Sequence, residues 1–355
     1  MKKEIHGHVN ELPNGCVLES DLYTESGALL CPKMTVVDEK IMQSLSAYKG
    51  LIHATISYES NTHEKVENIP EPDNSVCFDD SFKKYAVESL ATLYTNIEDV
   101  EGLTSGVIEI GEKVCDVIND SKDLSINLSK LKVSDEYTYK HSVDVGTMAA
   151  IIAKALGESD KFINDIAVAG LLHDIGKEEI PLSILNKPAK LSFDEFELMK
   201  THPVRGYRLL VDSTDISEEI RQAILNHHEN VDGTGYPRRL NSDKIGKMAQ
   251  IIAIVDVYDA LVTKRPYKEA KSPAEAIEIM FTMSNKFNLD YFRAFLSVVN
   301  IYPNGTKVKL SNGQSGIVIR QNKSYPLRPV IKITSIQTIV DLSINRDYLS
   351  TTIVA

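Results

Sequence analysis

Apolar residues recur at helical spacing through the middle of the chain. Val107, Ile110 and Val114, for example, lie three and four positions apart, which places them on one face of a helix. Such spacing runs from residue 81 to about 131 and returns in several stretches up to about residue 300. The middle of the chain is therefore predicted to be mainly α-helical.

The first part of the chain follows a different pattern. In residues 1–68, short apolar runs such as those at 17–18 and 51–52 alternate with turn signals such as the Pro-Asn-Gly at 13–15. We predict a small β-rich module there, with one short helix within residues 35–45.

A second β-rich segment is predicted at the end of the chain. Residues 306–310 alternate between polar and apolar side chains, and apolar runs follow at 316–319 and 330–333. The fold class is therefore mainly α, with a helical domain between two small β segments. The predicted organisation is a β-rich N-terminal regulatory module in residues 1–68, a linker with connecting helices in 69–128, a helical catalytic domain in 129–300 and a β-rich C-terminal extension in 301–355.

The net charge and the cysteine spacing argue against several classes of protein. The 355-residue chain carries a formal net charge of -11, which argues against nonspecific binding to nucleic acid or to an anionic membrane. Its four cysteines are scattered without a Cys-x-x-Cys pair, which favours reduced thiols over a disulfide framework. Neither a secretory signal nor an uncharged stretch of membrane-spanning length is recognisable. We expect a cytoplasmic protein.

Histidines and aspartates occupy or directly follow the apolar stripes of several predicted helices. His141 shares a helical face with Val145 and Met148, and other apolar runs lead directly into a histidine or an aspartate. Burying many such groups together is costly unless something charged compensates them, and metal ions are the simplest compensation. The candidate ligands are His141, His173, Asp174, His202, His227, His228 and Asp256.

These residues belong to a series of short motifs. In chain order the motifs are LHDIGK at 172–177, HPVRG at 202–206, HHENVDGTGYP at 227–237, DVYDAL at 256–261 and RPYK at 265–268. In content and order they resemble the HD-GYP family of bacterial cyclic-dinucleotide phosphodiesterases, over roughly residues 129 to 300. A lone His-Asp pair would be weak evidence, whereas the complete series is highly specific.

The resemblance implies a helical HD-type domain and a metal-dependent reaction. The expected activity is hydrolysis of cyclic di-GMP to the linear dinucleotide pGpG, with further cleavage to GMP left open. Two divalent metals roughly 4 Å apart, iron or manganese in this family, would clamp a bridging hydroxide and screen the phosphate charge. By resemblance, the first metal takes His141, His173, Asp174 and Asp256, and the second takes Asp174, His202, His227 and His228, so that Asp174 bridges them.

Four further residues are implied as contacts to the substrate. Lys177 is expected to meet a nonbridging phosphate oxygen and to act in catalysis together with Asp174, with an ordinary solvent-exposed lysine as the alternative. Arg265 and Lys268 resemble the substrate-binding pair of the family. Tyr236 either contacts the substrate or simply packs within its loop.

The motifs leave the number of metals, the reaction and the partners open. Certain family members bind a third metal through a glutamate four residues before the first histidine, and here that position is Tyr137, which favours a binuclear site. Hydrolysis of another cyclic dinucleotide such as 3′,3′-cyclic GMP-AMP, a non-catalytic dinucleotide-binding protein and an iron-dependent oxygenase are the alternatives. A homodimer or a signalling-protein partner is equally open.

Overall fold

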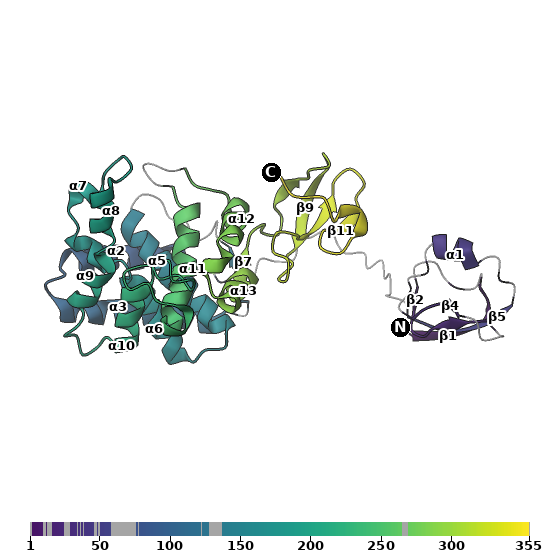
Figure 1. The fold of residues 1–355 in the computed structure, drawn as a ribbon, viewed down its shortest axis with the longest axis horizontal. Helices are drawn as coiled ribbons and strands as arrows, with labels where there is room; N and C mark the ends of the chain where they lie inside the picture. Colours follow the sequence, from purple (N-terminus) through teal and green to yellow (C-terminus); the bar gives the residue numbers. More distant parts are fainter. Residues whose placement is uncertain are drawn as a thin grey trace. The chain divides into compact units, whose positions relative to one another are not determined.

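The computed structural model forms two compact units, residues Met1–Ile69 and Pro70–Ala355, and we describe each by itself (Figure 1). The structure describes residues 2–9, 12, 16–24, 29–33, 35, 37, 39–45, 48, 50–57, 76, 78–121, 123–127, 137–264 and 269–354.

The first unit is a small β module with one short helix, as predicted. Its three-stranded sheet has β5 at the centre, paired antiparallel with β1 on one side and with β2 on the other, and β3 pairs with β4. Buried Leu18, Leu22, Ile52 and Ile56 form part of its own core. The elements are β1 (Lys2–His8), β2 (Val17–Leu18), β3 (Leu22–Tyr23), β4 (Leu29–Cys31), α1 (Glu39–Leu45) and β5 (Leu51–Ser57).

The second unit is mainly helical, which confirms the predicted fold class. Side chains cap several helix starts: Ser159, for example, accepts a hydrogen bond from the Phe162 amide and so satisfies a free N–H group at the start of α6. The helices are α2 (Asp80–Thr95), α3 (Val100–Asp120), α5 (Tyr137–Ala155), α6 (Asp160–Leu172), α7 (Leu182–Leu185), α8 (Phe193–Met199), α9 (His202–Leu209), α10 (Glu218–Asn226), α11 (Lys247–Val262), α12 (Pro273–Thr282) and α13 (Leu289–Val298).

The two helices before residue 121 share the core of the helices that follow them. Leu90 of α2 and Val107 of α3 are fully buried in one cluster with Ile151 of α5 and Ile252 of α11. The Tyr94 hydroxyl at the end of α2 also donates a 2.6 Å hydrogen bond to the carbonyl oxygen of Leu171, just before the predicted His-Asp motif. These helices therefore support the part of the fold that carries the candidate ligands.

The chain ends in a four-stranded antiparallel sheet with strand order β11-β10-β9-β8. Val308, Val318, Ile331 and Val340 fill a separate small core beneath it. The sequence pattern predicted the first three strands but not β11. The strands are β8 (Lys307–Lys309), β9 (Ser315–Arg320), β10 (Val330–Ile333) and β11 (Ile339–Asp341).

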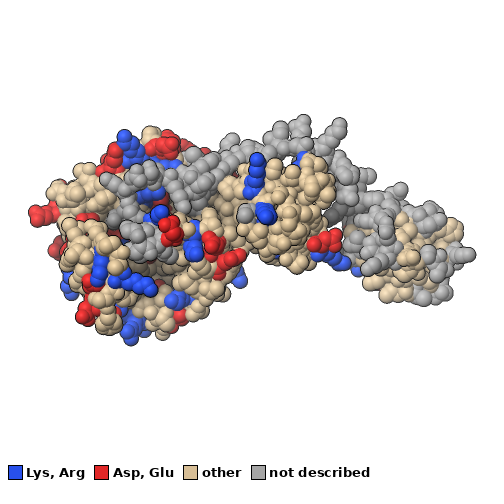
Figure 2. All heavy atoms as spheres, turned by 90° about the horizontal axis from the view of Figure 1, so that it is seen from above, with Lys and Arg blue, Asp and Glu red and all other residues tan. Residues whose placement is uncertain are grey.

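The surface carries charges of both signs. On the face shown in Figure 2, lysines and arginines are interspersed with aspartates and glutamates over the helical part. An anionic ligand would therefore depend on local positive groups, because the visible face offers no broad basic field. None of the described helices combines the length and the apolar character needed to cross a bilayer.

Candidate metal centre and its cavity

The predicted His-Asp pair lies where α6 ends. His173 caps the C-terminus of α6, and Asp174 leads into a short 3-10 helix, η2 (Ile175–Glu179). This turn can lie directly against the start of α9 because residue 176 is glycine: a Cβ at Gly176 would lie 2.0 Å from the carbonyl oxygen of His202. The glycine of the motif thus lets Asp174 and His202 come together.

A second close approach brings His141 to the same place. Helices α5 and α6 touch at two glycines, where a Cβ on Gly170 would lie 2.6 Å from the Cα of Gly146. The His141 ring on α5 consequently faces the His173 ring, with centroids 5.1 Å apart.

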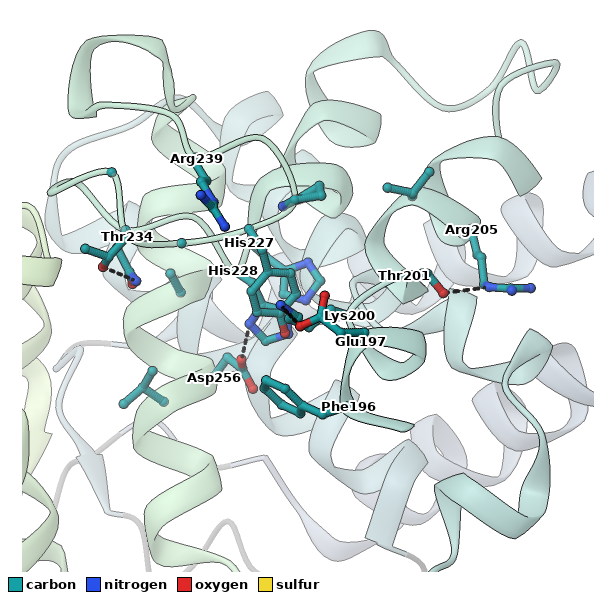
Figure 3. A pocket seen from close by; sticks show the side chains of 18 of the residues that line it. Phe196, Glu197, Lys200, Thr201, Arg205, His227, His228, Thr234, Arg239 and Asp256 are labelled. Atoms are coloured by element: carbon teal, nitrogen blue, oxygen red, sulfur yellow. Dashed lines mark hydrogen bonds and ion pairs between the residues drawn. The ribbon is translucent and has the colours of Figure 1, made fainter. Parts of the chain in front are cut away.

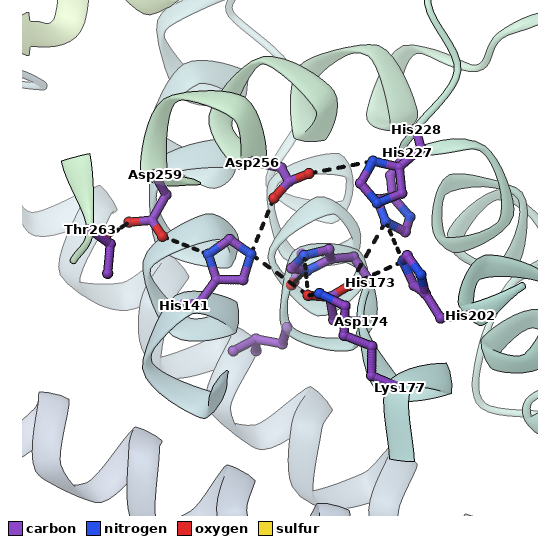
Figure 4. Close-up of polar contacts among 12 residues, drawn as sticks. His141, His173, Asp174, Lys177, His202, His227, His228, Asp256, Asp259 and Thr263 are labelled. Atoms are coloured by element: carbon purple, nitrogen blue, oxygen red, sulfur yellow. Dashed lines mark hydrogen bonds and ion pairs between the residues drawn. The ribbon is translucent and has the colours of Figure 1, made fainter. Parts of the chain in front are cut away.

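The remaining candidate ligands come from three other helices. His202 is the first residue of α9, and His227 caps the C-terminus of α10, with His228 next to it. Asp256 lies in the buried part of α11. Residues distant in the sequence are therefore gathered at one point of the helical domain (Figure 4).

The gathered side chains form two groups that could each hold a metal ion. Within each group the potential ligand atoms all lie within 4.8 Å of one another. The first group is Asp174, His202, His227 and His228, and the second is His141, His173 and Asp256. The division agrees with the one implied by the family resemblance, while the ligand roles themselves stay a prediction.

Asp174 lies between the two groups and presents one oxygen to each. Its Oδ1 lies 3.2 Å from Nε2 of His202 and 4.0 Å from Nε2 of His227. Its Oδ2 lies 3.3 Å from Nε2 of His173 and 3.7 Å from Nε2 of His141. A carboxylate in this position can serve two ions at once.

Backbone carbonyls orient three of the imidazoles. The Nδ1 atoms of His173, His202 and His227 lie 2.7, 2.8 and 2.7 Å from the carbonyl oxygen three residues earlier. A neutral imidazole that donates Nδ1–H to such a carbonyl keeps its Nε2 lone pair for a metal. The three Nε2 atoms therefore point inward as potential ligands.

Burial and neighbouring charges leave three of the candidate ligands in the protonation state that binds a metal. Burial, together with neighbouring imidazoles, holds the pKa of His227 well below its usual range, and burial lowers the pKa of His228 to about 3. Burial alone would raise the pKa of Asp174, but His173 and Lys177 hold it well below its usual range. These groups are thus neutral imidazoles and an ionised carboxylate at neutral pH.

Two buried atoms in the cluster have polar neighbours but form no hydrogen bond. His173 Nε2 and Asp174 Oδ1 form no hydrogen bond with any residue that the structure describes. Such buried polar atoms are costly unless a ligand satisfies them. The donor set and these two atoms fit a pair of divalent metals.

Asp259 was not assigned a role from the sequence, yet it contacts a candidate ligand. Its Oδ2 lies 2.5 Å from Nδ1 of His141, and the Thr263 hydroxyl donates a 3.1 Å hydrogen bond to its Oδ1. Burial opposes a charge on His141, but Asp256 and Asp259 outweigh it and raise the pKa of His141 to about 10. The two carboxylates of Asp256 and Asp259 therefore favour a positive charge at the His141 side chain.

Replacing Asp259 should weaken metal binding without removing a ligand. We expect Asp259→Asn to lower the affinity for the metal at the His141 group by about 10- to 100-fold, because the amide orients the imidazole less well and adds no charge. Competition with a chelator measures this affinity. Asp290→Asn, which alters an exposed carboxylate on α13, is the control, and equal affinities in both variants would contradict the role of Asp259.

Lys177 extends from η2 into the same cluster. Its ammonium group donates to Asp174 Oδ2, and its side chain is 24% exposed. Lys177 is thus not an ordinary surface lysine, because it lies beside the carboxylate shared by the two groups. Its contact with a phosphate stays a prediction.

A cavity of about 1080 Å³ opens beside the cluster (Figure 3). His227, His228 and Asp256 line it, as does Tyr236, whose ring lies 4.7 Å from that of His228. Tyr236 therefore both packs on a candidate ligand and borders the cavity.

The loop that carries Tyr236 is braced by Asp232. Asp232 Oδ1 accepts hydrogen bonds from the amide and the hydroxyl of Thr234, at 3.0 and 2.6 Å. The predicted substrate residues Arg265 and Lys268 lie outside the described residues.

Comparison with known proteins adds a family match. The family model for the HD domain matches residues 113–291. A cyclic di-GMP phosphodiesterase of Pseudomonas aeruginosa is 43% identical over 208 residues, which cover 59% of this chain and 50% of that protein.

Two further relatives have related names. A cyclic di-GMP phosphodiesterase of Thermotoga maritima is 40% identical, covering 46% of this chain and 45% of the relative. A 3′3′-cGAMP-specific phosphodiesterase of Vibrio cholerae is 28% identical, covering 80% of this chain and 52% of the relative. The chain spans about half the length of these relatives.

Proposed function

The chain belongs to the HD domain family, and we propose that it is a metal-dependent phosphodiesterase that hydrolyses cyclic di-GMP to pGpG. One observation carries the proposal: Asp174 presents its two oxygens to two separate groups of imidazoles and carboxylates. Members of both groups line the cavity, which is roomy enough for a dinucleotide.

In this proposal the cluster holds two metals, and Asp174 is a ligand of both. Divalent metals in such a site screen the phosphate charge and supply a water of lowered pKa as the nucleophile. The mixture of imidazole and carboxylate suits first-row metals, of which we favour iron or manganese. Lys177 would move from Asp174 to a nonbridging phosphate oxygen and stabilise the charge that develops there.

The nature of the substrate rests on the named relatives. Two of them are called cyclic di-GMP phosphodiesterases, and one is called specific for 3′3′-cGAMP. We place cyclic di-GMP first because the relatives with that name are the more similar in sequence. The relative named for cGAMP, which aligns over 80% of this chain, makes 3′,3′-cyclic GMP-AMP the second candidate.

Product chromatography with each cyclic dinucleotide tests the proposal. The metal-loaded chain should convert cyclic di-GMP to pGpG faster than it converts 3′,3′-cyclic GMP-AMP. The opposite preference would favour the second candidate. Binding without turnover of either compound would mean that the chain is a dinucleotide-binding protein instead.

We further propose that the chemistry resides in residues 129–300 and that residues 1–68 regulate it. All described candidate ligands and cavity residues lie in the second unit, Pro70–Ala355. A chain of residues 76–355 should therefore keep the metal and the turnover of the full chain. A folded, metal-loaded truncation without turnover would contradict this division. The homodimer, the signalling partner and the cytoplasmic location stay predictions.

A further inference from the structure

The cavity beside the metal cluster contains more positive side chains than were assigned from the sequence. They are Lys200, Arg205, Arg208 and Arg239. Lys200 is already paired with Glu197 at 2.5 Å, and Arg205 is paired with Glu179 at 3.0 Å. Among the described residues, the other two cations have no carboxylate within ion-pair distance, so their charge is available to a ligand.

Arg239 lies above two of the candidate ligands in the view of Figure 3. Its guanidinium group extends from the loop toward His227 and His228. It follows Tyr236, whose ring packs on His228, by three residues. Arg239 therefore approaches the candidate metal centre from the side of the cavity.

A buried carboxylate fixes the backbone around Arg239. Glu229, which is 2% exposed, accepts the amide of Arg238 on Oε1 at 2.6 Å and the amide of Leu240 on Oε2 at 2.9 Å. Arg239, held between these two bonds, has a φ of 54°. This left-handed conformation is uncommon for a residue with a side chain. Because it is an observed outlier beside a cavity, it points to a functional constraint.

Arg238, the residue before Arg239, has different surroundings. The Arg238 side chain contacts Gln222, at 3.2 Å, and is not among the residues that line the cavity. Arg239, one residue later, lines the cavity. Two adjacent arginines thus have different environments, and only the one in the left-handed conformation lies in the candidate site.

The charge of the substrate gives Arg239 a role. A cyclic dinucleotide has two phosphodiesters, and the metal cluster can act on one of them at a time. The chain as a whole carries a net charge of -11, so it does not attract a phosphate by its overall charge. The other phosphate therefore needs a positive side chain close to it. A guanidinium group can bind two oxygens of one phosphate in parallel.

Building on the proposed function, we propose that Arg239 binds the phosphate that is not being cleaved. The buried Glu229 holds Arg239 in place and acts as a positioning residue. The cavity thereby distinguishes a cyclic dinucleotide, which has a second phosphate, from a diester that has only one.

Arg239→Gly is a clean test because glycine adopts the left-handed conformation without strain. The variant should fold at least as stably as the wild type, which thermal unfolding checks. We expect its KM for cyclic di-GMP to rise about 10- to 100-fold, the loss typical of a charge-assisted contact. Arg239→Lys should recover part of this loss, because it keeps the charge but not the paired geometry. Arg238→Ala should keep the wild-type KM.

A second substrate separates this inference from the proposed function. Bis(4-nitrophenyl) phosphate has only one phosphodiester. The fold loss of kcat/KM caused by Arg239→Gly should therefore be at least ten times smaller for this substrate than for cyclic di-GMP. Equal losses for both substrates, or a wild-type KM for cyclic di-GMP in Arg239→Gly, would overturn the role of Arg239. If the wild-type chain cleaves the nitrophenyl diester but no cyclic dinucleotide, the proposed function fails, and the assignment of Arg239 fails with it.

Discussion

Replacing Asp174 by alanine is expected to abolish hydrolysis of cyclic di-GMP and to lower the amount of bound metal. The two oxygens of this carboxylate face different ligand groups, so its loss removes a ligand from both proposed ions. Because metal ions contribute several kcal/mol of transition-state stabilisation, the rate should fall by about 10³-fold or more. Metal analysis and turnover of the same sample measure both effects.

The helix that precedes Asp174 provides a matched control for this variant. Asp165 of α6 pairs with Lys161 at 2.5 Å, at a site where the lysine side chain is 78% exposed. Asp165→Ala removes the acidic partner of an aspartate–lysine pair outside the metal cluster. It should keep the metal content and turnover of the wild type. A folded Asp174→Ala variant with wild-type turnover would exclude the bridging role.

Replacing Lys177 by alanine is expected to have the second-largest effect, on turnover alone. The Lys177 ammonium group contacts Asp174 directly, and we propose that it also contacts the bound phosphate. Removing one such stabilising donor typically lowers kcat by about 10²- to 10³-fold. Metal content should not fall, because the change removes a positive charge next to the proposed cations.

Lys161→Ala, which removes an exposed ammonium group paired with Asp165, is the control for Lys177→Ala. Metal analysis distinguishes the two proposed roles, since loss of turnover with full metal content is expected for Lys177 and loss of both for Asp174. Wild-type turnover in Lys177→Ala would mean that this lysine only neutralises Asp174.

Much of the candidate metal cluster could be predicted from the sequence. Apolar residues at helical spacing place His141 on a buried face, and the structure buries it in α5 as expected. The motif series identified the family, and the match of the HD domain model to residues 113–291 confirms it. Local patterns sufficed because each candidate ligand lies in or next to a helix with a clear apolar face.

Contacts between distant segments could not be predicted in the same way. Asp259 and His141 are 118 residues apart, so their 2.5 Å contact depends on the packing of α11 against α5. The only local signal was the position of Asp259 one helical turn after Asp256. The Glu229 bonds that fix Arg239 are equally hidden, because no sequence pattern identifies an arginine with a positive φ.

The most direct test of the central claim combines metal content and turnover in one sample of the full chain purified without oxygen. We predict about two divalent metals per chain and conversion of cyclic di-GMP to pGpG, since the ligand set forms two groups that share Asp174. Chelation should abolish turnover, and added iron or manganese should restore it. Hydrolysis by the metal-free chain, or a folded and metal-loaded chain that cleaves no cyclic dinucleotide, would contradict the account.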